Sequence, residues 1–117
     1  MPLGMSLFDE NLNGEVNDQH VGAFLDMCLV GVLILTHLSP DEVKMRQVAV
    51  DDGRRGQGIG AGLVAFSERI CAKTGYKRIV LNARDTALAF YKQQGYTVVS
   101  DTFLEIGIPH AKMEKRL

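Results

Sequence analysis

The middle of the chain reads QVAVDDGRRGQGIG over residues 47–60. It opens with an apolar run, continues through acidic and glycine-rich residues, and ends where a new periodicity begins. Apolar side chains then recur at spacings of four, three and four residues, at Ile59, Leu63, Phe66 and Ile70. Such spacing places them on one face of a helix. The stretch therefore predicts a strand over 43–50, a glycine-rich loop, and a helix over 59–73.

The loop between this strand and this helix has the composition of an anion site. Gly56, Gly58 and Gly60 lack side chains, so a ligand can approach the backbone closely. A helix N-terminus adds unpaired N–H groups and the positive end of the helix dipole. Arg54 and Arg55 contribute mobile positive charge. We interpret the loop as a site for a pyrophosphate group.

Other nucleotide-binding loops fit this stretch less well. A dinucleotide-binding Rossmann unit needs an acidic residue about twenty positions after its glycines, and Asp85 lies too far along the chain. The residues before the loop also read as three successive strands rather than as the start of a β-α-β unit. A Walker A loop is excluded because no Gly-Lys-Ser or Gly-Lys-Thr follows. A plain glycine-rich turn remains the structural alternative.

The remaining segments predict an α/β fold, a mixed and mostly antiparallel sheet with helices packed on it. The expected strands cover 20–25, 28–38, 43–50, 78–81, 96–103 and 110–117, with Gly107-Ile108-Pro109 between the last two. A second helix over 85–94 is expected to begin at an N-cap, either Asp85 or Thr86. Gly75 and Gly95 are expected to end the two helices.

The bulk composition limits the class of protein. The chain of 117 residues fits a single domain, 1–117, in which 1–19 read as an irregular lead-in. A net charge of −1 gives no overall attraction to nucleic acid. The N-terminus lacks the pattern of a secretory signal, and the longest apolar stretch is too short to cross a bilayer. We therefore expect a cytoplasmic protein with no nucleic-acid or membrane partner. Cys28 and Cys71 match no metal-binding spacing, so we expect two reduced thiols and no metal.

Three motifs in order resemble the GNAT superfamily of N-acetyltransferases. Residues 54–60 resemble its R/Q-x-x-G-x-G/A signature, which binds the pyrophosphate of acetyl-CoA. Residues 82–96 are similar to its second motif, which ends in F-Y-x-x-x-G-[FY]. The tail over 103–110, with Met113, resembles a subgroup of small bacterial members. The resemblance extends from about His20 to the C-terminus and implies the GNAT acyl-CoA N-acyltransferase fold.

The resemblance also implies a site. It predicts a V-shaped opening between the strands around Val48 and Ile79, where a strand backbone pairs with the pantetheine arm. The residues expected to bind the cofactor are Val48, Ala49, Val50, Arg54, Arg55, Gly56, Gln57, Gly58, Ile59, Gly60, Asn82 and Tyr91. For Asn82 a simple turn or cap role is an equal alternative. Arg84 is either a phosphate contact or a surface charge.

Two residues are expected to move protons. Tyr91 matches the family tyrosine that donates a proton to the coenzyme A sulfur; a merely packed tyrosine is the alternative. His110 is the first candidate for the general base because histidine titrates near neutral pH, and Glu105 is the second. His20 and His37 are weaker candidates, and a chain of water molecules can replace a single base.

The implied reaction is transfer of the acetyl group of acetyl-CoA to a primary amine of a small molecule or peptide. The amine attacks the thioester directly in a ternary complex. Family members usually begin with a strand and two helices, and here only 1–19 precede the first expected strand. We therefore expect a domain without that N-terminal portion, with exposed apolar surface and a possible homodimer. The alternative is a truncated acyl-CoA-binding module or an oligomerisation domain without turnover.

Overall fold

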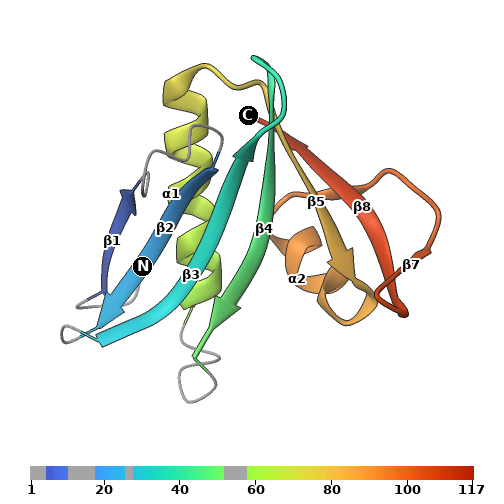
Figure 1. Cartoon of the computed structure of the whole chain (residues 1–117), viewed down its shortest axis with the longest axis horizontal. Helices are drawn as coiled ribbons and strands as arrows, with labels where there is room; N and C mark the ends of the chain where they lie inside the picture. Colours follow the sequence, from blue (N-terminus) through green and yellow to red (C-terminus); the bar gives the residue numbers. More distant parts are fainter. Residues whose placement is uncertain (1–4, 11–17, 26–27, 52–57) are drawn as a thin grey trace.

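The computed structural model describes residues 5–10, 18–25, 28–51 and 58–117. These residues form one mixed sheet of strand order β1-β2-β3-β4-β5-β8-β6, with β7 also paired to β8 (Figure 1). The strands are β1 (Met5–Glu10), β2 (Asp18–Leu25), β3 (Cys28–His37), β4 (Glu42–Val50), β5 (Arg78–Arg84), β6 (Thr97–Val98), β7 (Phe103–Glu105) and β8 (Ile108–Arg116). The helices are α1 (Ile59–Thr74), the short 3-10 helix η3 (Asp85–Ala87) and α2 (Leu88–Gln93). The α/β class expected from the sequence, a mixed and mostly antiparallel sheet with helices packed on it, is confirmed.

Helix α1 covers one face of β2, β3 and β4 (Figure 1). Side chains alternate between the faces of a strand, so every second residue meets the helix. On β3 these are Gly31, Leu33 and Leu35, all buried. Gly31 allows a close approach, because a Cβ there would lie 2.8 Å from Cδ1 of Leu63 and 3.0 Å from Cγ2 of Ile59. The apolar face of α1 therefore seals the core against this part of the sheet.

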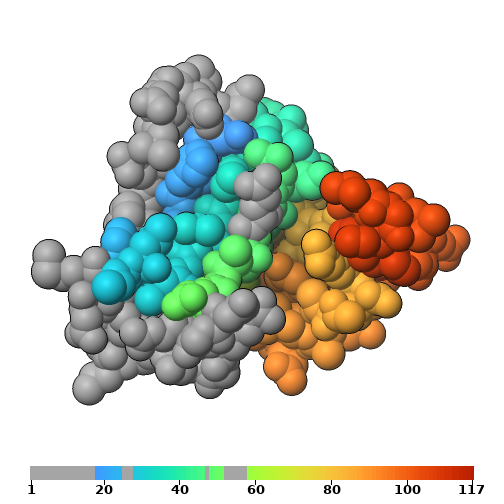
Figure 2. All heavy atoms as spheres, turned by 60° about the horizontal axis from the view of Figure 1, so that its bottom comes forward, coloured from blue at the N-terminus to red at the C-terminus, as the bar shows by residue number. Residues whose placement is uncertain are grey.

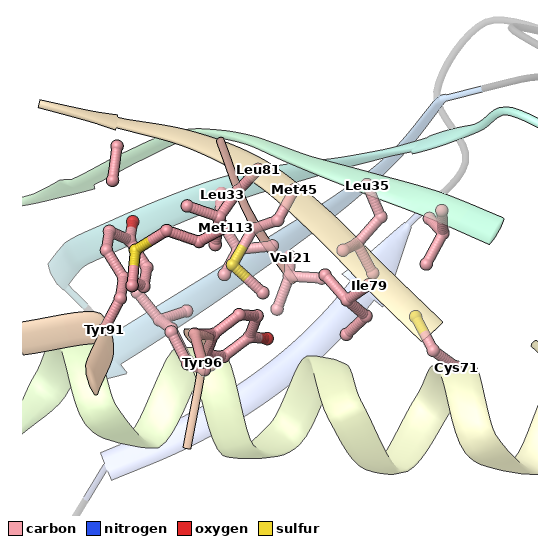
Figure 3. Packing of buried hydrophobic residues seen from close by; sticks show 14 of the residues in the cluster. Val21, Leu33, Leu35, Met45, Cys71, Ile79, Leu81, Tyr91, Tyr96 and Met113 are labelled. Carbon is pink, nitrogen blue, oxygen red and sulfur yellow. The ribbon is translucent and has the colours of Figure 1, made fainter. Parts of the chain in front are cut away.

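The core continues beneath both halves of the sheet. Figure 3 shows Leu33 of β3, Leu81 of β5 and Met113 of β8 in one buried cluster above α1. Tyr91 and Tyr96 belong to the same cluster, and their rings meet edge to face with centroids 5.8 Å apart. These two rings connect the packing around α2 to that around α1.

The face of β2–β4 opposite α1 is more polar than we expected. Its described residues include a network in which the Thr36 hydroxyl donates to Oδ1 of Asp18 at 2.7 Å. Nε of Arg46 donates to the same hydroxyl oxygen at 2.9 Å. Val32 is an exposed apolar side chain on this face. The exposed apolar surface that we expected is therefore interrupted by hydrogen-bonded polar groups.

Two expectations about the N-terminal and C-terminal strands were wrong. The lead-in over 1–19 is not wholly irregular, because β1 pairs along β2 with Met5 opposite Leu25. Its partner is distant in sequence, so local composition did not reveal the pairing. The strand expected over 96–103 is two short strands, β6 and β7. Between them the Ser100 hydroxyl accepts the Lys112 backbone N–H at 2.8 Å, in the place of a strand carbonyl.

The turn before β8 is also displaced from its expected place. Ile108 and Pro109 belong to β8, and the turn consists of Ile106 and Gly107. Both turn residues have positive φ, 51° and 71°, as a two-residue hairpin of the mirror-image type requires. Glycine suits that conformation, whereas Ile106 adopts it with a β-branched side chain.

The expected C-cap of the first helix is confirmed, and the expected N-cap of the second helix is wrong. Gly75 ends α1 at φ 108°, and its N–H donates to the carbonyls of Cys71 and Ala72. Neither Asp85 nor Thr86 caps α2, because η3 intervenes and Ala87 is the N-cap without a side-chain hydrogen bond. The Asp85 carboxylate instead accepts the N–H of Thr86 at 2.8 Å. A single turn of 3-10 helix thus replaces the capped start that the sequence suggested.

Several ionisable side chains on α1 or next to it are partly or fully buried. Nζ of Lys115 donates to Oε1 of Glu68 at 3.0 Å and to the Gln94 carbonyl at 2.7 Å. Burial, with the nearby Glu68 charge, raises the pKa of Cys71 from 9.0 to about 12. The same two causes raise the pKa of Tyr96. The Cys71 thiol and the Tyr96 hydroxyl therefore stay protonated in the folded protein well above neutral pH.

Two leucines on strands provide a matched test of the core. Leu33 is fully buried and Leu104 is 72% exposed. We expect Leu33→Ala to lower the free energy of unfolding by about 2–5 kcal/mol, since it leaves a cavity. Leu104→Ala should change it by less than about 0.5 kcal/mol. Urea denaturation followed by circular dichroism measures both, and similar losses in the two variants would contradict the assigned core.

The buried thiol predicts a loss of stability at alkaline pH. The unfolded thiol ionises near pH 9.0, whereas the folded thiol ionises near 12. The folded state therefore holds a proton that the unfolded state has released, and the free energy of unfolding should fall between these pH values. Cys71→Ala should weaken this dependence relative to wild type, while Cys28→Ala, at an exposed thiol, should not. Denaturation at a series of pH values measures the slopes; equal slopes in all three proteins would refute the assignment.

Candidate functional site

The gap between β4 and β5 is the feature around which the candidate site is built. The two strands are parallel and pair only over Glu42–Lys44 and Arg78–Val80. Beyond these pairs they diverge toward the end of the molecule where α2 lies (Figure 1). The expected opening is therefore present, with Val48 on its β4 side. Ile79 is not at the opening, because it lies in the paired segment opposite Val43. We call this opening the β4–β5 gap.

An irregularity in β4 accompanies the divergence. Val32 of β3 is opposite Ala49, whereas Ile34 is opposite Arg46. One extra residue of β4 is therefore accommodated opposite Leu33. Such a bulge bends its strand and increases the local twist. The bulge lies beyond Lys44, in the part of β4 that no longer pairs with β5.

The edge of β4 that faces the gap has backbone groups without strand partners among the described residues. Successive residues of a strand direct their N–H and C=O groups to opposite edges, and only one edge of β4 beyond Lys44 is paired, to β3. Val48 and Val50 point toward the core, where both are half-buried, and Ala49 is exposed. An extended ligand can pair with this edge through backbone hydrogen bonds.

Helix α1 begins at the same end of the gap. Arg54, Arg55, Gly56 and Gln57 lie outside the described residues. Gly58 is the N-cap with φ 77°, without a side-chain hydrogen bond, and the first turn holds no acidic residue. A helix start without a carboxylate leaves its N–H groups and its dipole available to an anion.

Two other residues expected to bind cofactor are placed by packing. Ile59 is fully buried in the core, so only its backbone can meet a ligand. A Cβ on Gly60 would lie 3.4 Å from Cζ of Phe90 and 3.7 Å from Cγ2 of Val50. Gly60 therefore brings α1, α2 and β4 close together. Phe90 is partly buried and packs against the core.

Tyr91 occupies the core side of the gap. It is buried on α2, and its ring meets Phe90 edge to face with centroids 5.0 Å apart. Figure 3 shows its hydroxyl directed from α2 toward the strands, away from α1. Burial raises the pKa of Tyr91. The phenol therefore keeps its proton at neutral pH and can serve as a donor.

Three polar residues gather on β5, β7 and β8. Nδ2 of Asn82 lies 3.4 Å from Oε1 of Glu105. The other carboxylate oxygen, Oε2, lies 3.4 Å from Nε2 of His110. All three were separate candidates in the sequence, and nothing in the sequence indicated that they lie close together. The β7–β8 hairpin brings them together, since it pairs Phe103 with His110 and places Glu105 opposite Ile108.

Comparisons with known proteins agree with this geometry. The sequence profile of the acetyltransferase (GNAT) domain matches residues 6–117. The chain belongs to the GNAT family. The N-acetyltransferase YjcF of Bacillus subtilis, itself uncharacterised, is 37% identical over 73 residues, which are 62% of this chain and 52% of YjcF. A second B. subtilis protein that carries the name of an acetyltransferase is 32% identical over 114 residues, 93% of this chain and 74% of its own. The chain thus spans about half the length of the first relative.

A solved structure has the same fold over nearly the whole GNAT domain. It is a GNAT family acetyltransferase from Elizabethkingia anophelis with acetyl-CoA bound. It superposes with a TM-score of 0.83 at 13% identity, covering 98% of this chain and 99% of its own. At that identity the likeness establishes the fold and leaves the site residues of this chain to be argued from its own geometry.

Of the remaining sequence candidates in this GNAT domain, the two histidines lie away from the gap. Nδ1 of His37 lies 2.6 Å from the Tyr76 hydroxyl, and His37 is opposite Val43 at the closed end of the sheet. His20 lies on β2, two strands from the gap. Arg84 is exposed on β5, opposite His110 in register. Neither His37 nor His20 is therefore a candidate for the general base.

Two features are absent from the described part of the chain. It contains no group of three or more His, Cys, Asp or Glu side chains that could hold a metal ion. Neither of its α-helices combines the length and hydrophobicity needed to cross a membrane.

Proposed function

We propose that this GNAT domain transfers the acetyl group of acetyl-CoA to a primary amine of a small molecule or peptide. The observation that carries the proposal is the β4–β5 gap, with its unpaired β4 edge, opening beside the uncapped start of α1. An acyl-CoA offers an extended pantetheine arm for the first feature and a pyrophosphate for the second. The buried Tyr91 adds a proton donor at the gap.

In the proposed complex the chain holds acetyl-CoA mainly through its backbone. The edge of β4 over Val48–Val50 would pair with the pantetheine amides, and one of its N–H groups would polarise the thioester carbonyl. The loop over 54–57, together with Gly58, would hold the pyrophosphate. Asn82 projects from the diverging part of β5 and is a polar side chain on the β5 side of the gap.

The proposed reaction is direct attack by the amine nitrogen on the thioester carbon. The carbon–sulfur bond of the resulting tetrahedral intermediate then breaks, and the sulfur leaves as a thiolate that must gain a proton. The Tyr91 hydroxyl would donate that proton and recover one from the nitrogen of the intermediate. Because burial raises the pKa of Tyr91, its proton is present when the thiolate forms.

A second function rests on the outer face of the sheet. No described helix covers the face of β2–β4 opposite α1. The described residues therefore leave part of the acceptor side of the gap uncovered. This favours an acyl-CoA-binding module without turnover, or a homodimer in which a second copy completes the wall. Binding of acetyl-CoA without release of coenzyme A in the presence of amines would support the first of these.

Calorimetry with two glycine variants tests the cofactor site. Gly58 and Gly75 flank α1 with positive φ, 77° and 108°, so glutamate at either position meets the same kind of backbone strain. We expect wild type to bind acetyl-CoA and Gly58→Glu to bind at least about tenfold more weakly, a loss of about 1.4 kcal/mol, because the carboxylate repels the pyrophosphate. Gly75→Glu, at the far end of α1, should bind like wild type. Equal affinities in all three proteins would place the phosphates elsewhere, and no binding by wild type at millimolar acetyl-CoA would refute the proposed function.

A pair of tyrosine variants tests the proton donor. Tyr91→Phe and Tyr96→Phe each remove one hydroxyl from a buried ring of the same cluster. If Tyr91 protonates the thiolate, Tyr91→Phe should lower kcat by about 100-fold, while leaving the affinity for acetyl-CoA unchanged. Tyr96→Phe should transfer acetyl groups at the wild-type rate. The release of the coenzyme A thiol in the presence of an amine measures both, and a wild-type kcat in Tyr91→Phe would reduce Tyr91 to a packing role.

A further inference from the structure

We propose that the Glu105 carboxylate takes the proton from the acceptor amine, and that His110 and Asn82 are positioning residues that hold this carboxylate beside the β4–β5 gap. The inference rests on the proposed function and assigns the group that the sequence left open. It also reverses the expected order of the two candidates, since the sequence favoured His110 as the general base.

Accessibility separates the two candidates. The Glu105 side chain is 45% exposed, whereas that of His110 is only 9% exposed. Phe103 lies over the histidine ring, with centroids 6.2 Å apart and planes at 22°. An acceptor amine can therefore reach the carboxylate but not the imidazole.

The hydrogen bonds of His110 lead to the same assignment. Nδ1 lies 2.7 Å from the carbonyl oxygen of Ile108. A carbonyl oxygen only accepts, so Nδ1 carries a proton. Nε2 lies 3.4 Å from Oε2 of Glu105. Both ring nitrogens are thus directed at protein groups, and the histidine can exchange a proton with an acceptor only through Glu105.

The carboxylate lies on the side of the sheet opposite the proposed acid. Ile79, Leu81 and Ala83 of β5 face the core, so Asn82 projects from the other face. Asn82 lies beyond the last β4–β5 pair, on the diverging part of β5, and its amide contacts Oε1 of Glu105. Tyr91 lies on the core side. An amine that enters from the outer face would contact the Glu105 carboxylate on that face. The coenzyme A thiolate would receive its proton from Tyr91 on the core side.

Each proton in the proposed reaction has a donor and an acceptor in this arrangement. The ammonium form of the acceptor gives one proton to the Glu105 carboxylate, and the freed amine attacks the thioester. The proton then lies between Oε2 and Nε2 of His110; when Nε2 carries no proton it accepts this one, and a carboxylate–imidazolium pair forms. After product release the pair returns that proton to solvent. The two residues therefore act together as one base, in which the proton is shared between Oε2 and Nε2.

The charges around the pair are known from the sheet register. Arg84 of β5 is opposite His110, and Lys112 of β8 is opposite Asn82, so both cations share this face. Glu114 follows two residues later on β8, opposite Val80. Arg84 and Lys112 are therefore next to the pair in the register, on β5 and β8. Glu114 supplies a matched control, since it is an acidic residue on the same face outside the cluster.

The first experiment compares Glu105→Gln with Glu114→Gln. The probes are acetyl-CoA with benzylamine, spermidine or a lysine-containing peptide, and coenzyme A release is measured beside calorimetric affinity for acetyl-CoA. With any probe that wild type acetylates, Glu105→Gln should lower kcat by about 100-fold or more. Its affinity for acetyl-CoA should stay within about threefold of wild type. Glu114→Gln should match wild type in both respects.

The second experiment tests positioning by His110. In His110→Asn the amide nitrogen stands near the place of Nδ1 and keeps a donor for the Ile108 carbonyl, while Nε2 is lost. The acid limb of the kcat/KM profile should then move, because the proton is no longer shared between Oε2 and a ring nitrogen. A merely structural role would lower activity without moving the limb. His110→Gln, which restores a polar atom near Nε2, should recover part of the rate.

The outcomes separate this inference from the proposed function. If wild type turns over and the kcat of Glu105→Gln is within about threefold of the wild-type value, the assignment of Glu105 is overturned. The acetyltransferase proposal would then still stand. Unmoved pH limbs in His110→Asn would overturn the role of the histidine. If wild type binds acetyl-CoA but acetylates none of the probes, or binds no acetyl-CoA, the proposed transfer falls and this inference falls with it.

Discussion

After Lys44 and Val80, β4 and β5 stop pairing, and the rest of the site depends on that separation. Backbone N–H and C=O groups ordinarily find partners, so a strand edge left open in the middle of a sheet invites a ligand with amides of its own. The bulge opposite Leu33 bends β4, and the packing of α1 on β2–β4 holds that half of the sheet together without help from β5. On the other side β5 is secured along its whole length by β8. The molecule can therefore leave the gap open at little cost to its core.

The sheet also divides the proposed chemistry between its two faces. Tyr91 lies in the apolar core beneath the gap, where burial keeps its proton in place. The polar cluster of Asn82, Glu105 and His110 lies on the outer face, where water and an acceptor can reach the carboxylate. Acetyl transfer to an amine needs a proton donor for the sulfur and a proton acceptor for the nitrogen. Figure 2 looks toward the end of the molecule where β4, in green, adjoins β5 and α2, in yellow and orange. A reactant bound at the gap would lie between these two groups.

Local sequence signals predicted the parts of the fold that local forces determine. The helix over 59–74 was evident because its apolar spacing and terminal glycine both act within a few residues. The strand at 5–10 was missed because it depends on pairing with the distant β2. The break in the strand after β6 depends on Ser100, whose hydroxyl replaces a backbone partner. The contact between Glu105 and His110 needed the hairpin register and the side-chain directions, and neither can be read from residue types. The family motifs predicted the gap, but not which acidic or basic group stands beside it.

Backbone amide shifts on addition of acetyl-CoA test the central claim most directly. In a series of 1H–15N correlation spectra, we expect the largest perturbations at Val48–Val50 and Gly58–Gly60, with Asn82 responding across the gap. Amides on the outer edge of the sheet, in β1 and β2, should stay unchanged. This pattern would locate the acyl-CoA in the opening between β4 and β5. Perturbations confined to β1–β3, with β4 unaffected, would contradict the account, because the unpaired edge would then have no part in binding.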